Sequence, residues 1–222
     1  MHKVFFAELL TGKNALLEAM LAFNAVSRPA EGPPEVSGLA PEQVATLWRR
    51  PCVRAAFPPA RPALASFWDF AEESRCLALL NQAGLDRLAG LFGAAVHAGA
   101  IAEVIVRDEV LALKRELGAD LYAYALGRGR FAAGSIAELF AGRDRRLPLA
   151  RRALRHGREA LAVIRRAWPE ALRARTRTLF TVPEGKMDGR VPDLVGVRDA
   201  VWFGLKKILL KEVVPQWAPC FS

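Results

Sequence analysis

Apolar residues recur every three or four positions along most of the chain, the spacing that aligns side chains on one face of an α-helix. The pattern is densest from Leu85 to Gly129. Gly99 interrupts it, and Gly118 and Gly127 fall where helices would end in a left-handed residue. We therefore predict three or four consecutive short helices, each too apolar to be stable unless the others cover it.

The longest predicted helix runs from about Leu149 to Trp168. At roughly 100° per residue, its apolar residues fall in one sector of the helical wheel: Leu154, Leu161, Ile164 and Trp168. Five arginines fall nearly opposite: Arg151, Arg155, Arg158, Arg165 and Arg166. Pro169 is expected to begin a separate helix, because proline is tolerated at the first helical position and breaks a helix interior.

A further helix is predicted near the C-terminus, and it ends at Pro215. Its apolar stripe consists of Val197, Val201, Leu205 and Ile208. Trp202 lies beside this stripe. Lys207 and Lys211 occupy another face near the helix C-terminus, where cations interact favourably with the helix dipole.

Two proline-rich stretches set the N-terminal part of the chain apart, residues 27–41 and 57–62. Because proline fixes φ, such stretches form semi-extended surface connections. We therefore predict an N-terminal helical arm with Pro-rich connections over residues 1–62 and a main helical domain over residues 63–222. The expected fold class is all-α, a single irregular multi-helix domain of short packed helices.

The composition favours a buried helical core. Hydrophobic residues make up 52% of the 222 residues, which argues against disorder, and the dominant Ala, Leu and Arg favour helix. Residues 88–106 are the most membrane-like run, but His97, Glu103 and glycines interrupt it, so a core helix is expected. The first residues lack signal-peptide features, and the three cysteines form no CxxC pair. Together these features indicate a soluble protein of a reducing compartment.

We find no motif that carries catalysis or cofactor binding. Nucleophile, phosphate-loop and dinucleotide motifs do not occur. His2, His97 and His156 share no metal-ligand spacing, and His97 is expected to be a hydrogen-bonded core histidine because its surroundings are apolar. The closest acidic cluster is interpreted as a solvated helix face: Asp69, Glu72 and Glu73. The sequence therefore predicts no catalytic residue, no metal, no cofactor and no enzymatic activity.

The formal charge of +9 permits an acidic protein, a nucleic acid or anionic lipid as a partner, and it does not choose among them. The arginine face of residues 149–168 has two open interpretations: a solvated helix face, or a contact surface whose guanidinium groups bind carboxylate or phosphate. No aromatic residues are interleaved with these arginines, which disfavours single-stranded nucleic acid. The candidate partner-binding residues are Arg151, Arg155, Arg158, Arg165, Arg166, Trp202, Lys207 and Lys211.

Two stretches of the chain resemble one known family. The first begins at Leu85 and reads LDRLAGLFGAAVHAGAIAEVIVRDEVLALKRELG, with a small-residue run that ends at His97; the second, near the C-terminus, reads LKKILLKEVVPQWAPCF. Both resemble the SctK family (YscK and its relatives), accessory proteins of bacterial type III secretion systems. The positions that carry the likeness are Leu88, His97, Ala100, Ile101, Leu113, Leu205, Lys206, Lys207, Val214, Pro215 and Phe221. The likeness covers roughly residues 80–222 and does not extend to the first sixty residues.

The resemblance implies a non-catalytic helical adaptor of the sorting platform, the cytoplasmic assembly beneath the inner-membrane ring of the injectisome. Such an adaptor would link the cytoplasmic domain of the ring protein SctD to the pod protein SctQ, and through SctQ to the stator SctL and the ATPase SctN. It would lie in the bacterial cytoplasm at the injectisome, with no nucleic acid bound and no membrane insertion. The alternative is a basic helical nucleic-acid-binding protein, and an enzyme with an unrecognised site ranks third.

Overall fold

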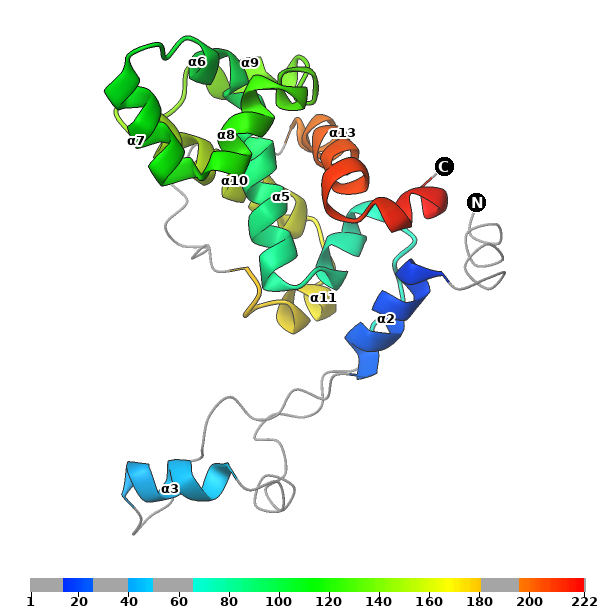
Figure 1. The fold of residues 1–222 in the computed structure, drawn as a ribbon. Helices are drawn as coiled ribbons and strands as arrows, with labels where there is room; N and C mark the ends of the chain where they lie inside the picture. The colour runs from blue at the N-terminus through cyan, green and yellow to red at the C-terminus, as the bar shows by residue number, and fades with distance from the viewer. Residues whose placement is uncertain (1–13, 26–39, 50–65, 181–195, 222) are drawn as a thin grey trace.

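The computed structural model describes residues 14–25, 40–49, 66–180 and 196–221 (Figure 1). Helices dominate and no strand occurs within these ranges, so the predicted all-α fold class is confirmed. The α-helices are α2 (Ala15–Ala25), α3 (Pro41–Trp48), α5 (Gln82–Val96), α6 (Ala98–Ala102), α7 (Arg107–Leu117), α8 (Ala119–Leu126), α9 (Ile136–Ala141), α10 (Leu149–Arg166), α11 (Glu170–Arg175) and α13 (Arg198–Ile208). The other elements are the 3-10 helices η1 (Glu73–Leu79), η2 (Arg128–Phe131) and η4 (Pro215–Cys220), and the π-helix η3 (Leu209–Val213).

Helices α5 and α10 form the centre of the molecule and meet with their backbones almost touching. A Cβ atom added at Gly93 would lie 2.0 Å from the carbonyl oxygen of Ala153, and one added at Gly157 would lie 1.9 Å from that of Ala89. The pairs run in opposite directions along the two helices, so α5 and α10 are antiparallel. Figure 1 shows α7 on one side of α5 and α13 on the other.

Phe92 of α5 is the side chain on which several helices converge. It is fully buried, and its ring makes an edge-to-face contact with Phe140 of α9 at 5.9 Å between centroids. Gly204 of α13 packs on the same ring, since a Cβ atom there would lie 3.2 Å from Phe92 Cε2. Leu121 of α8 fills the space beside Gly90. Helices α8, α9 and α13 therefore pack around α5.

The predicted helix ends are correct in part. Gly118 separates α7 from α8 with a φ of 94°, the left-handed conformation that glycine adopts at helix ends. Gly127 ends α8 with a φ of −98°, so the prediction of a left-handed residue there is wrong. The interruption expected at Gly99 lies at His97, because Gly99 falls inside α6. Helix α11 begins directly after Pro169, which confirms a separate helix there.

The C-terminal residues pack into the core. Helix α13 continues into the π-helix η3, in which the Val214 N–H donates to the Leu209 carbonyl at 2.9 Å. Pro215 then begins η4, so the helical segment ends where the proline predicts. Trp217 and Phe221 are both buried. Trp217 and Phe221 are therefore part of the hydrophobic core.

Helix α2 packs on these C-terminal residues, although it lies in the part of the chain predicted to be an arm. Leu16 and Met20 are buried, and the Asn14 amide Nδ2 lies 3.2 Å from Cys220 Sγ. Helix α2 also packs against η1. The predicted division of the chain at residue 62 stays a prediction, because residues 50–65 lie outside the described part.

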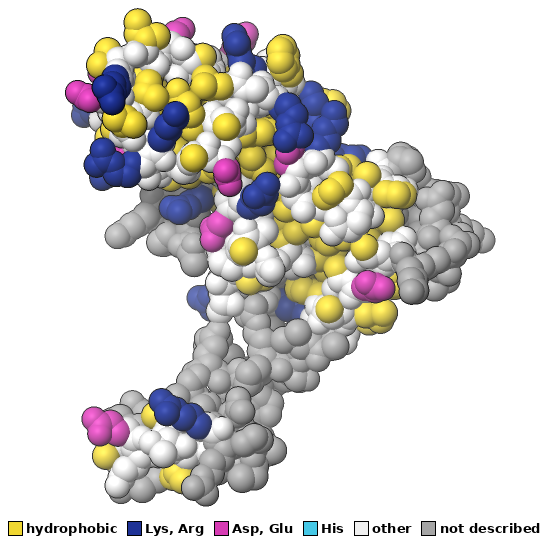
Figure 2. Space-filling model, viewed as in Figure 1, with side chains coloured by type: hydrophobic (Ala, Val, Ile, Leu, Met, Phe, Trp, Pro, Cys, Tyr) yellow, Lys and Arg dark blue, Asp and Glu magenta, His cyan; other side chains and the backbone are white. Residues whose placement is uncertain are grey.

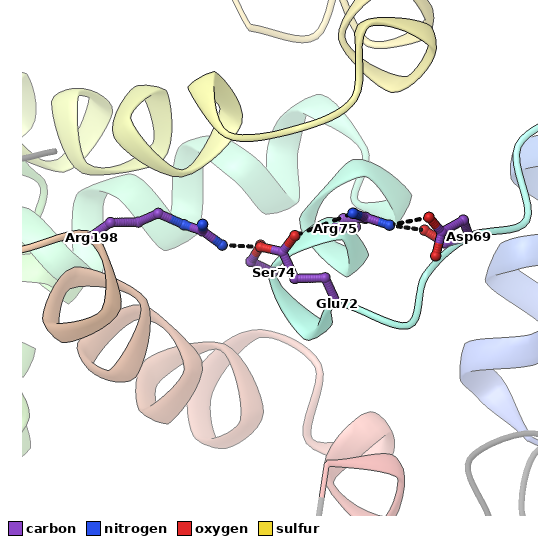
Figure 3. A network of polar contacts seen from close by, with 5 residues as sticks. All are labelled: Asp69, Glu72, Ser74, Arg75 and Arg198. Carbon is purple, nitrogen blue, oxygen red and sulfur yellow. Dashed lines mark hydrogen bonds and ion pairs between the residues drawn. The ribbon is translucent and has the colours of Figure 1, made fainter. Parts of the chain in front are cut away.

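A network of ion pairs and hydrogen bonds connects the start of α13 to the segment around η1 (Figure 3). The Glu72 carboxylate accepts a hydrogen bond from the Ser74 hydroxyl at 2.7 Å and pairs with Arg75 at 3.4 Å. Arg198 of α13 donates to the same carboxylate. Arg75 also pairs with Asp69. Glu72 thus joins three partners from two segments that lie 126 residues apart in the chain.

The 3-10 helix η1 carries a second link to α13 and a buried thiol. Lys206 donates to both carboxylate oxygens of Glu73, at 2.8 and 2.9 Å. The interpretation of Asp69, Glu72 and Glu73 as a helix face is therefore wrong, because the first two precede η1. All three are ion-paired, and the side chain of Asp69 is still 61% exposed. Burial, and then the nearby Glu73 carboxylate, raises the pKa of Cys76 to about 12, so this thiol is an inert core residue.

Candidate functional site

A cluster of charged and polar side chains lies between α10 and the turn that precedes it. Its members, the buried polar cluster, are His97, Arg143, Asp144, Arg155, His156 and Glu159. Arg143 Nη2 lies 3.3 Å from one oxygen of Glu159, and Arg155 Nε lies 2.9 Å from the other. Arg155 Nε is also 3.4 Å from Asp144 Oδ2. Two guanidinium groups thus balance two carboxylates.

Two histidines from different helices meet in this cluster. His97 follows α5 and His156 lies on α10, and His97 Nε2 is 2.8 Å from His156 Nδ1. His156 Nε2 lies 3.2 Å from Asp144 Oδ2. Because a carboxylate only accepts, His156 carries its proton on Nε2 and His97 donates from Nε2 to the free Nδ1. The expectation that His97 is a hydrogen-bonded core histidine is confirmed.

Both histidines are held in the neutral form. Burial, the neighbouring His156 and then Arg152 lower the pKa of His97 to about 3. Burial also lowers the pKa of His156, although its hydrogen bond to Asp144 acts in the opposite direction. The pair therefore forms a neutral hydrogen-bonded chain that ends on a carboxylate. Sequence reasoning missed this contact, since the two histidines are 59 residues apart and no motif links them.

The same cluster contains a possible metal-ligand set. Asp144, His156 and Glu159 each offer one ligand atom, and these atoms lie within 4.8 Å of one another. However, His156 donates to Asp144, and both carboxylates are paired with Arg143 or Arg155. A divalent cation would have to displace two guanidinium groups from carboxylates whose charge they already neutralise. The arrangement instead suits a buried network that fixes the turn at Asp144 to α10.

The predicted arginine face of α10 is only partly a surface. Arg151, Arg158 and Arg166 are exposed, and we call these three the α10 basic face. Arg151 Nε lies 3.8 Å from Glu116 of α7, at the outer limit of an ion pair between exposed groups. Arg155 is half-buried within the buried polar cluster. The structure therefore separates Arg155 from the exposed arginines.

Arg165 departs from the prediction most clearly, because it is buried. Its Nη2 donates to the carbonyl of Arg173 at 3.1 Å, and its guanidinium lies 5.3 Å from the ring centroid of Phe180. The chain after Pro169 folds back over this side of α10. The placement of Arg165 on an exposed face is therefore wrong, since a helical wheel takes no account of later segments.

The predicted residues of the C-terminal helix lie on or next to one exposed surface. Trp202 is half-buried, Lys207 donates from Nζ to the Phe131 carbonyl at 2.8 Å, and Lys211 is exposed on η3. Phe131 and Phe203 are 78% and 72% exposed. Sequence reasoning missed these two aromatics. Phe203 could have been found, because it falls outside the apolar stripe of its helix.

A shallow groove of about 380 Å³ lies where α5 begins beside the C-terminal elements. It is lined by Leu79, Leu80, Asn81, Ala83, Gly84, Arg87, Val213, Val214 and Trp217. The side chain of Asn81 is already used, since its oxygen caps α5 by accepting from the Gly84 N–H at 2.8 Å. Arg87 is the one charged residue of the lining. The groove thus offers mainly apolar contact.

Among the described helices, none is both long and apolar enough to cross a membrane. Comparisons of the chain with protein-family models, with curated proteins and with solved structures find no match.

Proposed function

We propose that this protein is a non-catalytic helical adaptor of the type III secretion sorting platform. It would link the cytoplasmic domain of SctD to the pod protein SctQ, and through SctQ to SctL and SctN, at the cytoplasmic face of the injectisome. The proposal starts from the resemblance of residues 80–222 to the SctK family. The observation that supports it in the structure is the presence of two separate exposed basic surfaces on one closely packed helical body.

An adaptor needs two surfaces that can be occupied at the same time. The α10 basic face begins beside α7, where Arg151 approaches Glu116. The second basic surface surrounds Lys207 and Lys211, where α13 meets η2. Because α7 and α13 lie on opposite sides of α5, two partners could bind without competing (Figure 1).

The exposed arginines support an electrostatic mechanism of association. A surface of one sign of charge attracts a partner of the opposite sign and raises the association rate, an effect that salt screens. Arg158 and Arg166 are exposed, and their guanidinium groups can form paired hydrogen bonds with carboxylates. Affinity would then come from apolar contacts made after the first encounter.

The test measures binding of the full chain to purified SctQ and to the cytoplasmic domain of SctD. We expect both to bind the wild-type protein. The double variant Arg158→Glu and Arg166→Glu should bind one of them about tenfold more weakly at low salt. Arg155 and Arg165 are left unchanged, because they stabilise the fold. The matched control, Arg49→Glu with Arg177→Glu, changes exposed arginines elsewhere by the same total charge and should bind normally.

Absence of wild-type binding to both partners rejects the adaptor. A basic helical nucleic-acid-binding protein is then the function to examine. It predicts binding to DNA or RNA whose affinity falls steeply with salt, because phosphate contacts release counterions. Unchanged binding by the α10 variant, with normal wild-type binding, would reject only the role of the α10 basic face.

A further inference from the structure

Two phenylalanines are left largely exposed where η2 meets α13. Phe131 is the last residue of η2 and Phe203 lies in the middle of α13, and their exposed fractions are 78% and 72%. Large aromatic side chains gain more free energy from burial than most residues and are enriched among the residues that dominate protein interfaces. Two of them on one surface therefore point to a contact that the isolated chain does not make.

Lys207 places the two phenylalanines on the same surface. It lies one helical turn after Phe203, so both side chains project from one side of α13. Its Nζ donates to the backbone carbonyl of Phe131 at 2.8 Å. Residues 76 positions apart in the chain are thus joined at this point. We call Arg130, Phe131, Phe203, Lys207 and Lys211 the aromatic–basic surface.

Cations outnumber carboxylates on this surface. Residues 128–131 and 203–212 carry five cations, and their one carboxylate is Glu212. Glu212 is already paired with Arg128 at 3.1 Å. Within the described residues, no carboxylate pairs with Arg130 or Lys211. The partner of Lys207 is a neutral backbone carbonyl and not a carboxylate. Figure 2 shows Lys and Arg side chains gathered beside the upper end of α13.

We infer that the aromatic–basic surface binds an acidic peptide segment of a partner protein, one that carries apolar side chains for Phe131 and Phe203. Carboxylates of the segment would pair with Arg130, Lys207 and Lys211 around the two aromatic anchors. This inference rests on the proposed function, since it assigns the surface to one of the two platform partners. It adds that the recognised segment is acidic and carries apolar side chains.

A protein segment suits this surface better than a nucleic acid. Single-stranded nucleic acid would stack on the phenylalanines, but it also needs cations free to track its phosphates. Two of the five cations are already used, because Arg128 is paired with Glu212 and Lys206 with Glu73. Asp199, one turn before Phe203, is exposed and would repel phosphate. A peptide can satisfy mixed charges of this kind through its own side chains.

The experiment compares two double variants of the full chain in binding to purified SctQ and to the cytoplasmic domain of SctD. Phe131→Ala with Phe203→Ala should weaken binding to one of them by at least about tenfold. The control, Ile105→Ala with Leu111→Ala, removes exposed apolar side chains elsewhere and should bind normally. Circular dichroism should show the same helix content in both variants, because all four side chains are substantially exposed.

A photo-crosslinking residue, p-benzoylphenylalanine, placed at position 131 or 203 identifies the segment that is bound. The partner peptide recovered by mass spectrometry should contain more Asp and Glu than Lys and Arg. A recovered peptide without that excess overturns the inference, and so does full binding by the Phe131 and Phe203 variant. Binding of an oligonucleotide by the wild-type chain, but not by this variant, would also overturn the inference. If the wild-type chain binds neither platform protein, the proposed function and this inference fall together.

Discussion

The close contact between α5 and α10 predicts a large effect of one added methyl group. Gly157→Ala would place a Cβ atom 1.9 Å from the carbonyl oxygen of Ala89, whereas ordinary contact begins at 3.4 Å. The helices would have to separate by up to about 1.5 Å at this point, the difference between those two distances. The obstructing atom belongs to the backbone, so no side-chain rotation can relieve the clash.

Two opposing terms set the magnitude of this effect. Overpacking a core costs about 1–3 kcal/mol, and the rigid neighbour at Gly157 favours the upper end of that range. Alanine is a better helix former than glycine by about 1 kcal/mol, which offsets part of the cost. We therefore expect a net loss of about 2 kcal/mol of unfolding free energy. For a chain of this size, that loss lowers Tm by roughly 4–8 °C.

The measurement is urea unfolding followed by far-ultraviolet circular dichroism. The midpoint of Gly157→Ala should fall with the slope unchanged, as for a loss of stability alone. Gly99→Ala is the matched control, because it adds the same methyl group in α6 with nothing within 4 Å. The control should unfold at the wild-type midpoint or slightly above it. Equal midpoints for Gly157→Ala and the wild type would refute the close helix contact.

Two further predictions concern the polar contacts. Glu72→Gln should lower the free energy of unfolding, measured in urea, by about 1–2 kcal/mol, because it weakens three charge-assisted bonds including that to Arg198. Asp69→Asn should lower it by less than about 0.5 kcal/mol, because the Asp69 carboxylate is exposed. Equal losses for the two variants would contradict the central place of Glu72 in the network. The pKa of His97 is lowered from 6.5 to about 3 in the folded state, so between these pH values the unfolded state binds a proton that the folded state does not. The stabilisation that comes from neutral His97 is therefore complete above pH 6.5. It falls by up to about 1.4 kcal/mol per pH unit as the pH decreases below that value. His97→Gln keeps a donor but cannot titrate, so its unfolding free energy should depend less on pH between 4 and 6.5, and a slope equal to that of the wild type would contradict the assignment.

The helices were predictable because their signal is local. The apolar spacing of residues 149–168 and Pro169 are enough to define α10 and the start of α11. The same wheel placed Arg165 on the exposed face, because it describes a single helix in isolation. Burial of Arg165 depends on Phe180 and Arg173, which return over α10 only in the folded chain. Local periodicity therefore predicts that a helix forms, but not what later covers it.

The polar contacts were not predictable for a related reason. His97 meets His156, and Glu72 meets Arg198, across separations of 59 and 126 residues. The spacing of residues along the chain does not indicate which distant side chains will meet in the folded protein. The candidate site could be predicted only in part. Lys207 and Lys211 follow from the polar side of the last helix, whereas Phe131 contacts Lys207 through its backbone carbonyl. Every residue has a backbone carbonyl, so the amino-acid sequence does not indicate which one accepts such a hydrogen bond.

The helices that carry the two exposed surfaces, α10 and α13, both pack directly on α5 at the centre of the molecule. Arg158 and Arg166 extend from α10, which touches the backbone of α5 at Gly157 and Gly93. Phe203 extends from α13, which packs through Gly204 on a ring of that same α5. The spacing between the two surfaces is therefore set by contacts with little room to adjust, because the packing partners are backbone atoms and a fully buried ring. A change that separates α5 from α10 should disturb the geometry of both surfaces together, whereas a substitution on one surface should leave the other in place.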